Sequence, residues 1–180
     1  MAVRIEVTEH IVGRSWLYEG KKRTGRKRLV PTYRLVLSVD QTDSSCPDQF
    51  FAVTRDTSPV IFGDTVRHYG TNGECPPSRI SSPYLAVWHQ HGSLQDALRL
   101  CEPRFGPVTI QGVGNVLRHG VLIHHGPARS EGCMLISGGQ KGWRQFLAAV
   151  RHFETVTADP SMYVYVQPRH FGNDNPLSCA

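Results

Sequence analysis

The stretch from Val121 to Ile136 (VLIHHGPARSEGCMLI) holds two histidines and a cysteine between two apolar segments. A cysteine attacks a carbonyl carbon only as a thiolate, and a nearby imidazole can take its proton. The loop between His124 and Cys133 can fold back and bring the imidazole and the thiol together from neighbouring strand ends. Gly132 permits a tight backbone approach beside the thiol, and the amides near Gly132 and Cys133 can point at an oxyanion. The segment therefore indicates acyl transfer by a cysteine nucleophile.

Two plainer interpretations of the same residues stay open. Cys133 can be a small buried thiol, since free cysteines are among the most buried residue types; the histidines are then strand ends with solvent partners. The two histidines and Cys133 can also bind zinc together with His89 and His91. Adjacent histidines do not easily face one ion, however, and nothing fixes a fourth ligand, so the sequence predicts no metal site.

The order of residues in this stretch resembles the active-site signature of the L,D-transpeptidase (YkuD-like) superfamily. The resemblance is to the short-loop variants in type VI secretion effectors and in small bacterial and phage proteins. It covers residues 123–136 and is carried by Ile123, His124, Gly126, Ser130, Gly132 and Cys133. The better-known branch usually has a His where this chain has Glu131. It also has an Arg that helps shape the site soon after the cysteine, where this chain has Met134 and Leu135.

The resemblance implies a cysteine acyl-transfer enzyme that acts on peptidoglycan stem peptides. Cys133 would attack the carbonyl of the third stem residue and expel the terminal D-Ala. His124 would accept the thiol proton and then protonate the leaving amine. An amine acceptor gives a cross-link or D-amino-acid exchange, and water gives carboxypeptidase activity. No metal or organic cofactor is needed for this chemistry.

The resemblance also implies roles for the other residues of the segment. Ser130 and Gly132 belong to the catalytic group, with Ser130 positioning the loop or the substrate, and a backbone carbonyl near Gly126 would orient the imidazole. The expected substrate-binding residues are His125, Gly126, Arg129 and Glu131. Aligning Ile-His-x-Gly selects His124 as the base, whereas aligning His-Gly selects His125. Strand neighbours face opposite ways, so only one should face the thiol, and we favour His124.

The segments around this motif are mostly strand-like. Apolar patterns predict strands at 3–19, 29–39, 50–53, 60–62, 84–89, 108–111, 120–124 and 161–167, and another after Cys133. Helical apolar spacing predicts a helix at 141–155, and a capping pattern at Ser93 predicts a short helix at 94–101. The sum is one mostly β or α+β domain over residues 1–180. With the resemblance, the expected fold is an L,D-transpeptidase-like β-sandwich with two short helices.

Most of the positive charge lies in one short run. The 180 residues include 20 Lys and Arg against 15 Asp and Glu, a net charge of +5. Six cations fall within residues 21–28, in a basic loop at 19–29 whose central glycine is typical of a hairpin. A non-catalytic module that binds nucleic acid or an acidic polymer through this run is the alternative function. No aromatic residue interleaves the charges, so the sequence favours a solvated hairpin over nucleic-acid binding.

The five cysteines of the chain show no C-x-x-C spacing, which disfavours a zinc ribbon or a dithiol redox motif. An odd number leaves at least one thiol unpaired within a monomer. Cys46 and Cys75 lie in proline-containing, loop-like stretches. They are either exposed thiols that can pair outside the cell or small buried ones.

The sequence carries no sign of a membrane segment or of a general secretory signal. Its first nine residues alternate polar and apolar side chains, and no apolar run approaches about 18 residues. We therefore expect synthesis in the cytoplasm and action in the periplasm or cell wall of a target cell, after delivery by a contractile secretion system or by phage lysis. A delivered effector is expected to have a secretion-system carrier and an immunity protein as partners. The tail at 171–180 is expected to be loose.

Overall fold

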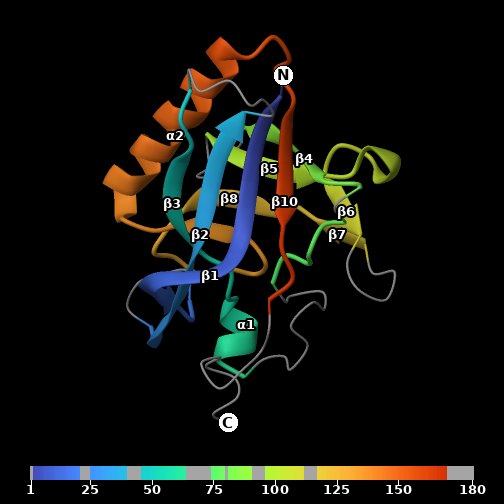
Figure 1. The fold of residues 1–180 in the computed structure, drawn as a ribbon. Helices are drawn as coiled ribbons and strands as arrows, with labels where there is room; N and C mark the ends of the chain where they lie inside the picture. Colours follow the sequence, from blue (N-terminus) through green and yellow to red (C-terminus); the bar gives the residue numbers. More distant parts are fainter. Residues whose placement is uncertain are drawn as a thin grey trace.

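The computed structural model describes residues 2–20, 25–39, 46–63, 74–79, 81–90, 96–111 and 117–169. The described chain is built mainly from strands, joined by short helical turns and one long helix (Figure 1). The elements in chain order are β1 (Val3–Tyr18), β2 (Lys27–Val39), β3 (Gln49–Thr54), α1 (Ser58–Ile61), β4 (Tyr84–His89), β5 (Ala97–Cys101), the 3-10 turn η2 (Pro103–Phe105), β6 (Thr109–Gln111), β7 (Leu117–His119), β8 (Leu122–His125), β9 (Met134–Ile136), α2 (Gly139–Val156) and β10 (Met162–Val166).

The main sheet closes on itself as a barrel, in the order β1-β10-β4-β5-β8-β9-β3-β2. β6 and β7 form a separate two-stranded sheet. The mostly β or α+β class is thus confirmed, whereas the expected β-sandwich is wrong. Closure follows from the first strand, because β1 pairs with β2 on one side and with β10, the last strand, on the other. A sheet whose first and last strands pair has no free edge, so it forms one ring instead of two layers.

The short helix predicted at 94–101 is wrong, because Ala97–Cys101 forms strand β5. β5 pairs with β4 on one side and with β8 on the other. Leu98 and Leu100 are fully buried in the core, and Asp96 has a left-handed backbone with φ of 63°. The predicted capping residue, Ser93, lies outside the described residues. Pairing on both sides therefore outweighs the local capping signal at this position.

The strand predicted at 60–62 is also wrong, since Ser58–Ile61 forms the short helix α1. Pro59 explains the difference, because proline cannot donate to a strand ladder but fits the first turn of a helix. The helix predicted at 141–155 is confirmed as α2, although its 18 residues make it long. Only one of the two expected short helices therefore corresponds to a helix, and that one is not short.

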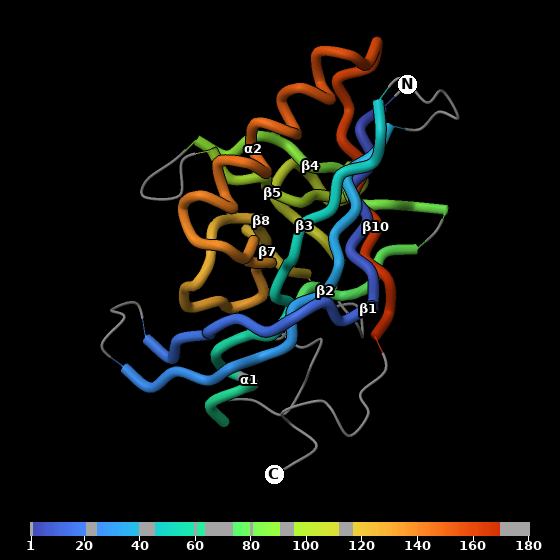
Figure 2. The backbone as a smooth tube through the Cα atoms, turned by 60° about the vertical axis from the view of Figure 1, so that its left-hand side comes forward, coloured from blue at the N-terminus to red at the C-terminus, as the bar shows by residue number. Residues whose placement is uncertain are grey.

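The core fills the interior of the barrel, and α2 packs against it along one side (Figures 1 and 2). Helical spacing brings one stripe of α2 inward, consisting of Trp143, Phe146, Ala149, Val150 and Phe153. The Phe146 ring meets the Phe51 ring of β3 edge-on, with 5.2 Å between ring centres. Ile123 of β8 and Met134 of β9 lie in the same core. The inner face of β8 and β9 is therefore committed to packing.

The hairpin of β1 and β2 extends beyond the other strands and lies beside α1 (Figure 2). Its pairing runs from Val3 opposite Val39 to Tyr18 opposite Lys27, with irregular register between Val7 and Gly13. Residues 27–29 of the expected basic loop belong to β2, and residues 21–24 lie outside the described residues. The tail at 171–180 also lies outside them.

Candidate functional site on the outer face of the barrel

The candidate site lies on the outer face of β8 and β9. These parallel strands pair Ile123 with Met134 and His124 with Leu135. Because Ile123 and Met134 point into the core, their neighbours in sequence point outward. Leu135 and Cys133 accordingly pack in a second, outer cluster with Leu17, Val30 and Ile61. His124 and Cys133 therefore share one face, about 8 Å apart between Cα atoms by the spacing of neighbouring strands.

The imidazole of His124 is held in one tautomer by the backbone. Its Nδ1 lies 3.0 Å from the carbonyl oxygen of His125. A carbonyl can only accept a hydrogen bond, so Nδ1 carries the proton and Nε2 keeps a lone pair. Burial lowers the pKa of His124 to about 4, partly offset by this hydrogen bond. At neutral pH His124 is therefore an uncharged imidazole able to accept a proton at Nε2.

His125 points the other way. It is paired with Ile136, which belongs to the core inside the barrel. The two imidazole planes are nearly perpendicular, at 81°. Of the two histidines proposed as the base, His124 is thus the one on the thiol's face. His125 was expected to bind substrate, but the register places it on the opposite face, away from the thiol.

Cys133 is a partly exposed residue immediately before β9. Its sulfur lies 3.9 Å from the Gly120 carbonyl oxygen. Burial raises the pKa of Cys133, while a backbone hydrogen bond at Leu122 and the charge of Arg118 lower it, and Glu131 raises it. Together these influences raise the pKa of Cys133 above its ordinary value, so the thiol is protonated at neutral pH. No hydrogen bond joins it to His124 within the described chain.

The loop before the thiol is held by two serines. Ser130 is buried, and its hydroxyl donates to the Cys133 carbonyl at 2.7 Å and accepts from the Gly132 N–H at 3.3 Å. Ser58 donates from its N–H to the Ser130 carbonyl at 2.8 Å, and the Ser58 hydroxyl accepts from the Ser130 N–H at 3.1 Å. Ser130 thus positions the loop. The Gly132 amide, one of the two expected oxyanion donors, is engaged with the Ser130 hydroxyl.

Two glycines of the motif are required by the backbone. Gly132 has a φ of 117°, a conformation that favours glycine. Gly126 donates its N–H to the Ile136 carbonyl, and a Cβ added there would lie 3.1 Å from that oxygen and 3.1 Å from the Leu135 Cβ. Gly126 was expected to bind substrate, but its visible role is this close contact between β8 and β9.

Arg129 and Glu131, the remaining substrate-binding candidates, form an ion pair with each other in the loop. The Glu131 carboxylate is exposed, whereas Arg129 is half-buried. Of the two, Glu131 acts on the Cys133 thiol through its charge, which raises the pKa of the thiol.

Arg118 of β7 is a site residue that sequence reasoning missed. It is buried and donates to the Glu74 carbonyl, and from its second terminal nitrogen to the Glu131 carbonyl at 3.3 Å. Its charge lowers the pKa of both Cys133 and Cys75. Nothing in the sequence around Arg118 indicates this contact, because it depends on the fold that brings β7 to the loop.

A buried ionic cluster lies behind Arg118. Arg169 contacts Asp56 at 2.7 Å, Glu74 at 3.0 Å and the Tyr33 hydroxyl at 2.6 Å, and Arg55 lies 3.7 Å from Glu74. Burial raises the pKa of Glu74 to about 7, against the lowering charges of Arg169 and Arg55. Arg118 donates to the backbone carbonyls of both Glu74 and Glu131, so it links this cluster to the loop before the thiol.

Cys75 is buried, and its thiol is free, as are those of Cys46, Cys101 and Cys133 within the described chain. Burial raises the pKa of Cys75 to about 12. Of the two interpretations of Cys75, the buried thiol is therefore confirmed.

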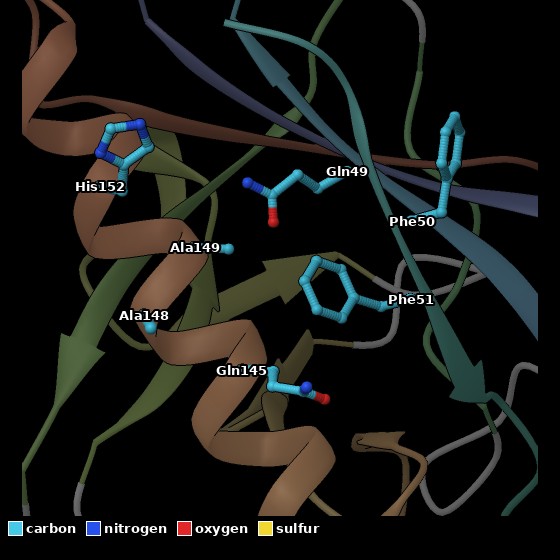
Figure 3. Close-up of a pocket in the computed structure, with 7 residues that line it drawn as sticks. All are labelled: Gln49, Phe50, Phe51, Gln145, Ala148, Ala149 and His152. Atoms are coloured by element: carbon cyan, nitrogen blue, oxygen red, sulfur yellow. The ribbon is translucent and has the colours of Figure 1, made fainter.

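A groove of about 640 Å³ lies elsewhere, between β3 and α2 (Figure 3). Gln49 and Phe51 point toward the helix, while Phe50 points away on the other side of the strand. The helix contributes Gln145, Ala148, Ala149 and His152. None of the motif residues lines this groove, so it is separate from the thiol site.

Comparison with protein-family models, curated proteins and solved structures gave no match. Among the described residues, no three His, Cys, Asp or Glu side chains gather as they would around a metal ion. No helix in the described part of the chain is long and apolar enough to cross a membrane.

Proposed function

We propose that this protein is a cysteine acyl-transfer enzyme that acts on peptidoglycan stem peptides, as an L,D-transpeptidase or L,D-carboxypeptidase. The observation that carries the proposal is the common outer face of His124 and Cys133 on adjacent parallel strands. The hydrogen bond from His124 Nδ1 to the His125 carbonyl supports it, because it leaves Nε2 free to act as a base. The resemblance of residues 123–136 to the L,D-transpeptidase signature supplies the substrate class.

The protonation states favour a particular sequence of steps. The resting pair is a neutral thiol and a neutral imidazole, because burial raises the pKa of Cys133 and lowers that of His124. His124 therefore removes the thiol proton as the sulfur attacks the carbonyl carbon of the third stem residue. Collapse of the tetrahedral intermediate breaks the bond to D-Ala, whose amine takes the proton from His124. An amine or water then releases the acyl group from the sulfur.

Arg118 compensates for the departure from the family signature after the cysteine. Its guanidinium lies between the Glu74 and Glu131 backbones and lowers the pKa of Cys133. It therefore stabilises the thiolate that forms during attack, from a strand outside the motif. In this proposal Arg118 is a positioning residue, because it acts on the substrate through Cys133 and the loop.

The proposal includes a route of action. We infer that the protein is made in the cytoplasm and delivered to the periplasm or cell wall of a target cell, with a secretion-system carrier and an immunity protein as partners. The His/Cys motif and its resemblance to the short-loop effector variants support this route. Confinement of the native protein to the cytosol of its producer would contradict it.

Mass spectrometry of tetrapeptide muropeptides incubated with the purified protein tests the activity. We expect loss of the terminal D-Ala, or its exchange for an added D-amino acid, with the parent protein and not with Cys133→Ala or His124→Gln. Cys46→Ala and His152→Gln are matched controls, since they remove a thiol outside the motif and an exposed imidazole on α2. Unchanged muropeptides with a folded, reduced parent protein would overturn the proposal.

A further inference from the structure

The distal part of the β1–β2 hairpin carries an unusual amount of exposed apolar surface. We call residues 11–18 and 27–34 the arm. Five of the seven large apolar side chains exposed in the described chain lie on the arm or next to it, namely Ile11, Val12, Trp16, Leu29 and Phe50. Trp16 and Leu29 are 42% and 43% exposed and are paired across the two strands, so they lie on one side of the arm.

The apolar surface continues from the arm onto the barrel. Val12, Arg34 and Phe50 line one shallow hollow on the outer side of β3. Phe50 is 60% exposed and points away from α2 (Figure 3). Its ring centre lies 5.6 Å from the Arg34 guanidinium. Scattered exposed apolar residues need no explanation, but a group of them mixed with cations indicates an interaction surface.

The arm is also purely cationic. Its exposed charged residues are Arg14, Lys27, Arg28 and Arg34, and its two strands contain no Asp or Glu. The connection between the strands adds Lys21, Lys22 and Arg23 in sequence, and its one carboxylate, Glu19, is ion-paired with Arg26. Since the whole chain has a net charge of +5, this one element accounts for the basic character of the protein.

The aromatic residues near these cations are arranged for an interface and not for stacking on bases. The Lys27 ammonium lies 4.6 Å from the centre of the Trp16 ring. Arg26 and Arg28 lie 5.5 and 5.9 Å from the centre of the Phe62 ring. A single-stranded nucleic acid needs free aromatic faces, and these faces already carry cations. Exposed aliphatic side chains such as Leu29 and Val12 also have no function on a phosphate backbone.

We propose that the arm is a docking surface for the headgroup region of an anionic lipid bilayer. Trp16, Leu29 and Phe50 would enter the boundary between headgroups and acyl chains, where aromatic and aliphatic side chains of peripheral proteins lie. The cations of the arm would face the lipid phosphates. The positive charge of the arm favours an anionic partner. The exposed apolar side chains favour a bilayer, because a fully polar polyanion offers them no apolar environment.

The arm is joined directly to the thiol site. The Tyr18 N–H donates to the Ala128 carbonyl at 3.3 Å, and the Tyr18 carbonyl accepts from the Ser58 hydroxyl at 2.6 Å. Leu17 and Leu135 belong to the same apolar cluster. Docking of the arm would therefore hold the candidate site close to the bilayer surface. This inference does not depend on the proposed activity, and it is tested in a protein that lacks the thiol.

Co-sedimentation of the Cys133→Ala protein with lipid vesicles tests the docking surface. We expect binding to phosphatidylcholine vesicles that contain phosphatidylglycerol, and none to pure phosphatidylcholine vesicles. Each basic residue near an anionic surface contributes about fivefold to binding, so a Lys27→Glu/Arg28→Glu variant should bind at least about 25-fold more weakly. Trp16→Ser/Leu29→Ser should also lose binding, because it removes the inserted apolar pair. On binding, tryptophan fluorescence should shift to the blue, and Trp16→Phe should abolish this shift.

The matched control is Lys141→Glu/Arg144→Glu, which makes the same charge change on exposed positions of α2. It should bind vesicles like the parent, and circular dichroism should show that all variants are folded. The proposal is overturned if anionic vesicles do not bind or if the α2 control loses binding equally. It is also overturned if Trp16→Ser/Leu29→Ser binds like the parent, or if an oligonucleotide is bound in place of the vesicles.

Discussion

Burial of the His124 imidazole determines how the proposed enzyme should respond to pH. Burial lowers the pKa of His124 to about 4, so the imidazole loses its activating lone pair only in acid. We expect muropeptide turnover to fall with a midpoint at about pH 4 and to stay level from about pH 5 to neutral pH. A pH profile of kcat/KM measures this. An acidic limb near the ordinary imidazole value would contradict a buried, neutral base.

Arg118 should control the reactivity of the Cys133 thiol. Replacing it by Met removes a nearby positive charge, which raises the pKa of Cys133 further and reduces the thiolate fraction. Alkylation of Cys133 by iodoacetamide at mildly alkaline pH, followed by peptide mass spectrometry, should slow about tenfold for each unit by which the pKa rises.

Two variants separate this electrostatic effect from damage to the fold. Arg118→Lys keeps the charge and should restore most of the alkylation rate. Arg144→Met removes an exposed charge on α2 and should leave the rate unchanged. Equal or faster alkylation of a folded Arg118→Met protein would show that the guanidinium does not stabilise the thiolate.

At the scale of elements, the contact between β8 and β9 depends on Gly126. A Cβ at this position would lie 3.1 Å from the Ile136 carbonyl oxygen, inside ordinary contact distance. Gly126→Ala should therefore lower the free energy of unfolding by about 1–3 kcal/mol and displace His124 from the thiol's face. Gly25→Ala is the control, because its nearest non-neighbouring atom would be 3.8 Å away. Urea unfolding of both variants measures the difference, and equal stabilities would contradict the close-contact argument.

The sequence predicted the elements whose local pattern agrees with their environment. Strands β1, β2, β4 and β10 have alternating patterns, and α2 has a clear apolar stripe. The predictions from sequence were wrong where the conformation of a segment is decided by packing partners that are distant in the sequence. Ala97–Cys101 is a strand because β4 and β8 pair with it from both sides. Closure of the barrel likewise depends on pairing between β1 and β10, which lie at opposite ends of the chain.

The candidate site was predictable only in part, for the same reason. The motif itself identified Cys133 and two candidate bases, and strand alternation predicted that only one histidine would face the thiol. The register of β8 and β9 then selects His124. Arg118 and Ser58 reach the site from β7 and α1, and nothing in their local sequence indicates that contact. Long-range contacts of this kind require the fold.

At the scale of the whole molecule, two buried groups should act on stability in opposite directions as pH changes. Burial raises the pKa of Glu74 from 4.5 to about 7. The folded state therefore holds a proton that the unfolded chain has lost, and this stabilisation, complete below about pH 4.5, disappears as pH rises through 7. Burial lowers the pKa of His124 from 6.5 to about 4. Its stabilisation is complete above about pH 6.5 and disappears as pH falls through 4.

Each contribution is on the order of 3 kcal/mol, and between pH 4.5 and 6.5 they largely cancel. Substituting one of the two residues should make the pH dependence of stability due to the other residue measurable. Relative to the parent, Glu74→Gln should gain stability as pH rises from about 4.5 to 7, because the ionisation that destabilises the fold is gone. As pH rises from about 4 to 6.5, the His124→Gln variant should lose stability relative to the parent, because only the parent gains the contribution of the neutral imidazole. Urea unfolding across this range measures both differences. For each variant, the difference in free energy of unfolding from the parent is plotted against pH. Slopes of the same sign for the two variants would contradict the raised pKa of Glu74 and the lowered pKa of His124, and with them the assignment of His124 as a neutral base.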